Sequence, residues 1–174
     1  MSDTVEGWGD AELAALGKVA ANFAELEWQG GRLLAGFISP AGIAVILTAG
    51  EDFRWKLDKL SVIAVETLGD PLASSELQDW VKASRILADR RNQFTHSSYL
   101  AQAGTQQSLT RMKASTRGGR WRGQSEPIGL ADLSEVAGLL AEGVEAADQV
   151  AEHLASCPEW RDPAVVPPPG GAVT

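Results

Sequence analysis

A repeat of apolar residues near the end of the chain constrains the fold more than any other feature. Between Leu130 and Leu154 the apolar residues recur at steps of three and four: Leu133, Val136, Leu140, Val144, Ala147, Ala151 and Leu154. This spacing places them on one face of an α-helix. A helix with a continuous apolar stripe must bury that stripe against other elements, so we expect a helical bundle.

Earlier segments show the same helical periodicity. The first expected helix runs from a cap at Gly9-Asp10 to Phe37, and a short apolar helix follows from Ser39-Pro40 to Gly50. The third runs from Glu51 to a stop at Gly69. After a turn at Asp70-Pro71, the fourth runs from Ser74-Ser75 to the polar stretch Arg90–Tyr99. Caps, a proline at the first helical position and glycines at the ends mark these boundaries.

Helical periodicity disappears between Ala101 and Gly129, where glycines interrupt a weak alternation. We expect a loop or a short β-hairpin there. The predicted fold class is all-α: an antiparallel bundle of four to five helices with this hairpin or loop inserted before the last helix. One domain is expected over residues 1–157, and the Pro- and Gly-rich residues 158–174, with little to bury, are expected to form a flexible tail.

Composition excludes several kinds of site. The chain has one cysteine, Cys157, and two histidines, so one chain offers neither an internal disulfide nor a Cys/His zinc site, and we expect a reducing compartment. Residues 1–6 lack the features of a signal peptide, and no apolar run reaches the ~18 residues that a membrane helix needs. We therefore expect a soluble, cytoplasmic protein with no membrane partner.

Basic residues are concentrated in the middle of an acidic chain. The net charge is −8, from 15 Lys and Arg against 23 Asp and Glu, which alone argues against nucleic-acid binding. Residues 81–125, however, hold nine basic residues and the single acid Asp89, which makes +8 for this segment and −16 for the remainder. Such polarisation can create a positive surface on an acidic protein, although a solvated polar loop explains the same composition.

The stretch from Arg90 to Tyr99 concentrates more chemistry than any other part of the sequence. Arg91 falls on the apolar stripe of its helix, where an unpaired guanidinium is costly to bury, so we expect it to face a carboxylate, a subunit interface or an anionic ligand. Asn92 and His96 are four residues apart and share a helix face. Arg91 and His96 are five apart, about 140° around an ideal helix. They converge only if the helix unwinds, if the arginine reaches round, or if a second copy supplies the partner.

Arginine and histidine together provide what cleavage of an RNA backbone requires. The 2′-hydroxyl must lose a proton, the leaving 5′-oxygen must gain one, and the charge on the phosphorane must be stabilised. An amide such as that of Asn92 can orient the imidazole or a phosphate oxygen. Used twice across a dimer axis, one such motif supplies both proton-transfer groups.

At these residues the sequence resembles the HEPN (higher eukaryotes and prokaryotes nucleotide-binding) superfamily. Its motif is Arg, a polar residue that is often Asn, three variable residues and His, and here it reads Arg91-Asn92-Gln93-Phe94-Thr95-His96. The expected helical layout is similar over roughly residues 10–156. The resemblance implies a bundle that dimerises so that two motifs face one another, often as a metal-independent endoribonuclease of toxin–antitoxin, defence or RNA-processing systems. Arg91 and His96 would be catalytic and Asn92 would orient them, with no metal or other cofactor.

Six further residues are expected to contact RNA: Arg85, Arg90, Tyr99, Arg120, Trp121 and Arg122. Trp121 lies between two arginines, so it can stack on a base while its neighbours hold phosphates, or it can pack on the bundle as a hairpin residue.

Two other interpretations remain open. The same cluster can form a non-catalytic module that binds RNA or a nucleotide, since some HEPN-like proteins keep the fold without cleavage. Alternatively, Arg91, Asn92 and His96 satisfy free carbonyls at the helix C-terminus, and the chain is an interaction protein whose acidic surface meets a basic partner. The expected partners are therefore a second copy of the chain, RNA or a nucleotide, and another protein.

Overall fold

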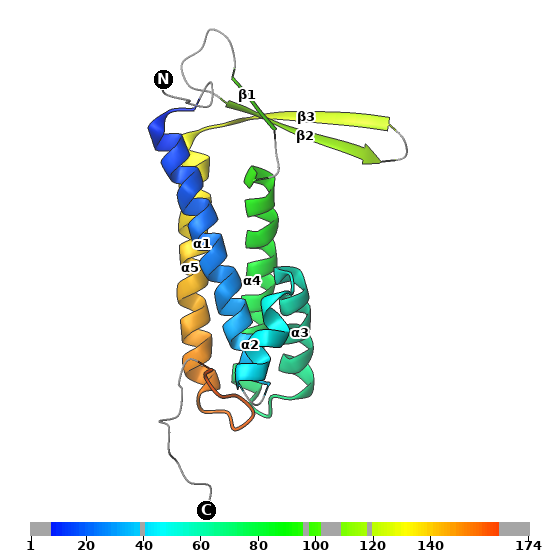
Figure 1. The fold of residues 1–174 in the computed structure, drawn as a ribbon, viewed down its shortest axis with the longest axis vertical. Helices are drawn as coiled ribbons and strands as arrows, with labels where there is room; N and C mark the ends of the chain where they lie inside the picture. Colours follow the sequence, from blue (N-terminus) through cyan, green and yellow to red (C-terminus); the bar gives the residue numbers. More distant parts are fainter. Residues whose placement is uncertain (1–7, 39–40, 96–97, 102–108, 118–119, 164–174) are drawn as a thin grey trace, which may run out of the picture. The chain divides into compact units, whose positions relative to one another are not determined.

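The computed structural model describes residues 8–38, 41–95, 98–101, 109–117 and 120–163 (Figure 1). Within these ranges the elements are α1 Asp10–Ala35, α2 Ala41–Ala49, α3 Phe53–Glu66, α4 Pro71–Thr95, β1 Ser98–Ala101, β2 Leu109–Arg117, β3 Arg120–Ile128 and α5 Leu130–Leu154. Most described residues are helical, and the prediction of an all-α helical bundle is confirmed. None of the described helices is long and apolar enough to cross a membrane.

Contacts divide the chain into two compact units that share the three long helices. The helical unit, residues 25–85 and 143–174, contains α2, α3 and the parts of α1, α4 and α5 that fall in these ranges. The sheet unit, residues 1–24 and 86–142, contains the remaining parts of those helices and the three strands. The single domain expected over residues 1–157 stays a prediction.

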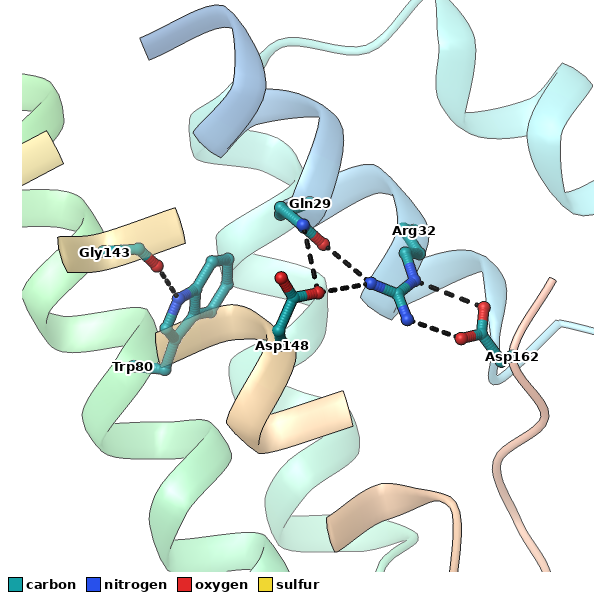
Figure 2. A network of polar contacts seen from close by, with 6 residues as sticks. All are labelled: Gln29, Arg32, Trp80, Gly143, Asp148 and Asp162. Carbon is teal, nitrogen blue, oxygen red and sulfur yellow. Dashed lines mark hydrogen bonds and ion pairs between the residues drawn. The ribbon is translucent and has the colours of Figure 1, made fainter. Parts of the chain in front are cut away.

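Branched and aromatic side chains from four helices fill the core of the helical unit. Its buried residues include Leu26, Leu33, Leu34, Phe53, Leu57, Leu60, Leu77, Trp80, Ala147 and Leu154. The Trp80 Nε1 donates to the Gly143 carbonyl oxygen at 2.9 Å (Figure 2), so the indole is buried with its one donor satisfied. At Gly30 an added Cβ would lie 2.7 Å from a ring carbon of Phe53, which explains why glycine is needed inside this helix.

The chain that follows α5 is anchored to the end of α1 within the helical unit. Trp160 is buried, and its Nε1 donates to the Leu33 carbonyl oxygen at 3.1 Å. The Arg161 amide donates to the Gly36 carbonyl oxygen at 2.9 Å. Gly36 permits this approach, because a Cβ there would lie 2.0 Å from the Trp160 Nε1.

These contacts correct the expected start of the flexible tail. The prediction that the chain from Pro158 onward has little to bury is wrong for residues 158–163, because Trp160 brings a large apolar ring that the end of α1 covers. Residues 164–174 of the expected tail lie outside the described residues.

The beginning of α4 also differs from the prediction. The helix starts at Pro71, not after Ser74, because Asp70 acts as its cap. The Asp70 Oδ1 accepts hydrogen bonds from the amides of Leu72 at 2.8 Å and Ala73 at 3.3 Å. Proline is favoured at the first helical position, so Asp70-Pro71 opens the helix instead of forming a separate turn.

The three strands form one antiparallel sheet in the order β1-β2-β3 (Figure 1). β1 pairs with residues 109–112 of β2, whereas β3 pairs with the whole of β2. Residues 113–117 and 120–124 therefore continue beyond β1 as a two-stranded ribbon. Of the two alternatives predicted for residues 101–129, the hairpin is confirmed for β2 and β3.

The sheet unit has a core of its own, to which its helices, Trp8 before α1 and Ile128 at the end of β3 contribute side chains. Its buried residues include Trp8, Val19, Phe23, Leu87, Phe94, Ile128, Leu133, Val136 and Leu140. The Asn22 Nδ2 donates to the Ala137 carbonyl oxygen at 2.8 Å, which ties α1 to α5 in this unit.

We expect Gly36→Ala to destabilise the protein, because the added methyl group would overlap the buried Trp160 ring. Overpacking of this kind costs about 1–3 kcal/mol. The free energy of unfolding, measured by urea titration with far-ultraviolet circular dichroism, gives the change.

Gly31→Ala is the matched control, because nothing lies within 4 Å of the position that its Cβ would occupy. Alanine in a helix is favoured over glycine by roughly 1 kcal/mol, so this variant should be more stable than wild type. An equal stabilisation by Gly36→Ala would contradict the close approach of Trp160.

Candidate functional site

Arg91 lies on the buried stripe of α4 in the sheet unit, between Leu87 and Phe94. These two neighbours are only 8% and 7% exposed, and Arg91 itself is half-buried. The Arg91 Cζ lies 4.3 Å from the centre of the Phe23 ring on α1, a cation–π contact worth about 0.5–2 kcal/mol. Among the described residues, the partner of this guanidinium is therefore an aromatic face. A carboxylate was one of the expected partners.

The polar atoms of Arg91 are only partly satisfied. Its Nη1 donates to the Oδ1 of the exposed Asn92 at 3.0 Å, while its Nε is buried without a hydrogen-bond partner among the described residues. An unpaired buried donor costs about 1–3 kcal/mol, and more when the group is charged. Since a guanidinium has several N–H donors, Arg91 keeps hydrogen-bonding capacity for an anion that reaches this surface.

The contacts of Arg91 also bear on the alternative of a helix cap. Within the described chain its side chain meets a ring and an amide oxygen, not a carbonyl at the end of α4. The hydroxyl of Thr95 makes the backbone contact of the last turn, since Thr95 Oγ1 donates to the Arg91 carbonyl oxygen at 3.1 Å. His96 lies outside the described residues, so its convergence with Arg91 and Asn92 stays a prediction.

Two nearby arginines of α4 are engaged in ion pairs on the surface. In the sheet unit the Arg90 Nη1 lies 3.1 Å from the Glu135 Oε1, and in the helical unit the Arg85 Nη2 lies 2.7 Å from the Asp58 Oδ1. Exposed pairs of this kind contribute about 0–1 kcal/mol. Arg85 and Arg90 can therefore exchange a carboxylate for a phosphate at little cost.

The remaining residues predicted to contact RNA lie on the strands. Tyr99 of β1 is opposite Arg111 of β2, and Arg120, Trp121 and Arg122 are consecutive on β3. Because successive residues of a strand lie on alternate faces of the sheet, Arg120 and Arg122 share one face and Trp121 is on the other. A ligand that binds one face of the sheet therefore cannot both stack a base on Trp121 and place phosphates on Arg120 and Arg122.

An open groove of about 360 Å³ lies between α1 and α5 in the sheet unit. Small residues such as Ala14 and Gly138 line it, together with Lys18, Asn22 and Ser134. The Asn22 amide already bonds to a backbone carbonyl, and none of the predicted site residues contributes to the lining. The groove lacks the convergent polar groups that mark an active site.

A charged cluster in the helical unit surrounds Arg32 (Figure 2). Its Nη1 lies 2.7 Å from the Asp148 Oδ1, and its Nε and Nη2 donate to the two carboxylate oxygens of Asp162 at 3.2 and 2.5 Å. The hydrogen bonds to Asp162, followed by the contact with Asp148, raise the pKa of Arg32 against the opposing effect of burial. Gln29 contacts both Arg32 and Asp148. All three guanidinium nitrogens are bonded, so this cluster links chain segments and leaves little for a ligand.

Sequence reasoning missed both Phe23 and the Arg32 cluster. The partners of Arg32 lie 116 and 130 residues away in the chain, and the Phe23 contact joins two helices whose mutual rotation no local pattern specifies. In the sequence Phe23 is an apolar residue of the first expected helix, which identifies it only as a core residue.

Two other chemically reactive residues have structural surroundings. His153 contacts the Glu76 carboxylate on the surface of the helical unit. Burial raises the pKa of the Cys157 thiol, which disfavours the nucleophilic thiolate. No group of three or more His, Cys, Asp and Glu able to hold a metal ion occurs in the described part of the chain.

No protein-family model, curated protein or solved structure matches this sequence. The membership in the HEPN superfamily that the motif implies stays a prediction.

We expect Phe23 and Arg91 to be energetically coupled. Phe23→Leu removes the ring face under the guanidinium, and Arg91→Met removes the charge while keeping most of the side chain. A double-mutant cycle on the free energy of unfolding should give a coupling of about 0.5–2 kcal/mol. The control pairs Phe23→Leu with Arg54→Gln, an exposed residue of α3, and should be additive. Additivity in both cycles would contradict the cation–π contact.

Proposed function

We propose that the chain is a HEPN-like, metal-independent endoribonuclease that acts as a homodimer. In this proposal Arg91 holds the scissile phosphate, His96 transfers protons and Asn92 orients them. The observation that carries the proposal is the half-buried Arg91 guanidinium, which lies over the Phe23 ring and has N–H donors besides the one that Asn92 accepts.

The reaction assigned to these groups is an internal transfer at phosphorus. His96 takes the proton of the 2′-hydroxyl, whose oxygen attacks the adjacent phosphorus. The bond to the 5′-oxygen breaks, this oxygen keeps the electron pair, and a second imidazole supplies its proton. The products are a 2′,3′-cyclic phosphate and a 5′-hydroxyl. Arg91 stabilises the negative charge of the phosphorane, the step at which preformed donors contribute most.

The homodimer follows from the need for two proton-transfer groups. One chain offers a single histidine in this motif, at the fifth position after Arg91. A twofold axis brings the same patch of both subunits together, so His96 of each copy could act as the base or the acid. The resemblance associates such enzymes with toxin–antitoxin and defence systems, and we extend the proposal to a cytoplasmic enzyme restrained by a partner protein.

A second candidate is a module that binds RNA or a nucleotide without cleaving it. The contacts of Arg91 with Phe23 and Asn92 support this candidate as they support the enzyme, because they hold a guanidinium where an anion can bind.

We expect the purified protein to cleave labelled RNA in the presence of EDTA and to leave 2′,3′-cyclic phosphate ends. His96→Ala should lower the rate by about 10²–10⁴-fold, the usual contribution of general acid–base catalysis. Arg91→Lys keeps the charge but loses the planar fork, so it should also lower the rate. Arg54→Gln, on exposed α3, is the control and should leave the rate unchanged.

The alternatives predict different results. Cleavage that persists in His96→Ala contradicts the catalytic assignment. Binding without turnover in wild type, weakened by Arg91→Ala, selects the non-catalytic module. An unchanged RNA affinity in Arg91→Ala, with altered stability alone, contradicts both and leaves a protein-interaction role.

A further inference from the structure

The basic residues of the β2–β3 hairpin all belong to one face of the sheet. Residues paired across antiparallel strands share a face, and successive residues alternate between faces. The pairs on the first face are Leu109–Ile128, Arg111–Glu126, Lys113–Gln124, Ser115–Arg122 and Arg117–Arg120. This face carries five basic residues and one acid, and we call its basic residues, Arg111, Lys113, Arg117, Arg120 and Arg122, the basic ladder.

The opposite face of the hairpin carries no charged residue within the described strands. Its pairs are Thr110–Pro127, Met112–Ser125, Ala114–Gly123 and Thr116–Trp121. The short strand β1 adds no charge to either face, since it reads Ser-Tyr-Leu-Ala. The charges of the hairpin are therefore segregated completely by the strand register.

This arrangement is unfavourable for the hairpin alone. Arg117 is directly opposite Arg120, and like charges in such a pair destabilise a sheet by roughly 0.2–1 kcal/mol. Both residues lie on the part of the hairpin beyond its described pairing with β1, and two-stranded ribbons are only marginally stable. A bound polyanion would remove the repulsion at the place where the sheet is weakest.

We propose that the basic ladder binds the phosphodiester backbone of single-stranded RNA, a choice of nucleic acid that rests on the proposed function. Residues two apart on a strand are separated by about 6.8 Å, similar to the spacing of successive phosphates along an extended strand. Four of the five ladder residues are arginines, whose planar forks match phosphate oxygens. The ladder therefore recognises the repeating backbone and not the base sequence.

Composition argues against two other polyanionic partners. From Lys113 to Arg122 the ladder face holds only basic residues and Ser115, so it offers no apolar residue to insert into an anionic membrane. An acidic protein segment carries carboxylates only where its sequence places them, whereas a phosphodiester backbone carries a charge at every nucleotide. Both partners are outcomes of the experiment below.

Binding of fluorescein-labelled 2′-O-methyl oligouridine to the full chain tests the ladder, because this RNA lacks the attacking hydroxyl and cannot be cleaved. Arg117→Gln/Arg120→Gln should raise the Kd several-fold at low salt and reduce the slope of log Kd against log salt by about 1.4, since each phosphate contact of a single strand contributes about 0.7. Its melting temperature should not fall, because the substitution removes a like-charge pair.

Two control variants distinguish the effect of the basic ladder on the Kd from the effects of net charge and of base stacking. Arg54→Gln/Arg161→Gln changes the charge equally at exposed positions of the helical unit and should keep the wild-type Kd and slope. Trp121→Ala alters the uncharged face and should also leave the Kd unchanged. Equal losses in the ladder variant and the charge control, or a wild-type slope in the ladder variant, would overturn the proposal.

Competing partners and the proposed catalysis give distinct outcomes. Tighter binding to phosphatidylserine vesicles or to a polyglutamate peptide than to the oligouridine would overturn the assignment to RNA. If wild type binds through Arg117 and Arg120 but does not cleave RNA, the ribonuclease proposal fails and the ladder stands. If cleavage depends on His96 but the ladder variant binds normally, the ladder fails and the ribonuclease stands.

Discussion

The apolar stripe of α5 is the constraint on which both parts of the structure depend. Leu133 and Leu140 are fully buried in the sheet unit, and Ala147 and Leu154 are fully buried in the helical unit. Burial of each such leucine stabilises the fold by about 1.5–3 kcal/mol. Because one helix supplies both cores, the parts of α1 and α4 in each unit must direct apolar residues to the core of that unit and polar residues to their other faces.

Arg91 departs from the rule that the buried stripes of the helices hold apolar residues. It occupies a position between two buried apolar residues of α4, with one face of its guanidinium over Phe23 and its Nε unpaired. An apolar side chain would fill this position without the cost of an unsatisfied charged group. Departures of this kind are expected at functional sites. The Arg32 cluster shows the opposite case, in which carboxylates pair every nitrogen of the guanidinium and the result is structural.

Helix periodicity predicts the fold class because an apolar stripe is set by residues that are close in sequence. Contacts between distant segments are not encoded locally in this way. Asp70-Pro71 shows the limit for boundaries, since the same dipeptide is typical of a turn and of a helix start. The contact of Trp160 with Gly36 escapes prediction because proline-rich composition indicates disorder and the partner is distant in sequence. For the candidate site, the apolar stripe of α4 predicts that Arg91 is partly buried. Phe23 is identified as its partner only by the mutual rotation of α1 and α4.

The proposed enzyme requires that Arg91 and His96 act together in a composite site of a dimer. Wild-type and His96→Ala proteins can be unfolded together in equal amounts, refolded and assayed for RNA cleavage. If each site needs the imidazoles of both copies, only dimers of two wild-type chains are active, and random pairing in a twofold-symmetric dimer should leave roughly a quarter of the activity of the same total amount of wild type. A mixture that keeps roughly a half of that activity, as expected if each copy works alone, would contradict a site composed of both copies.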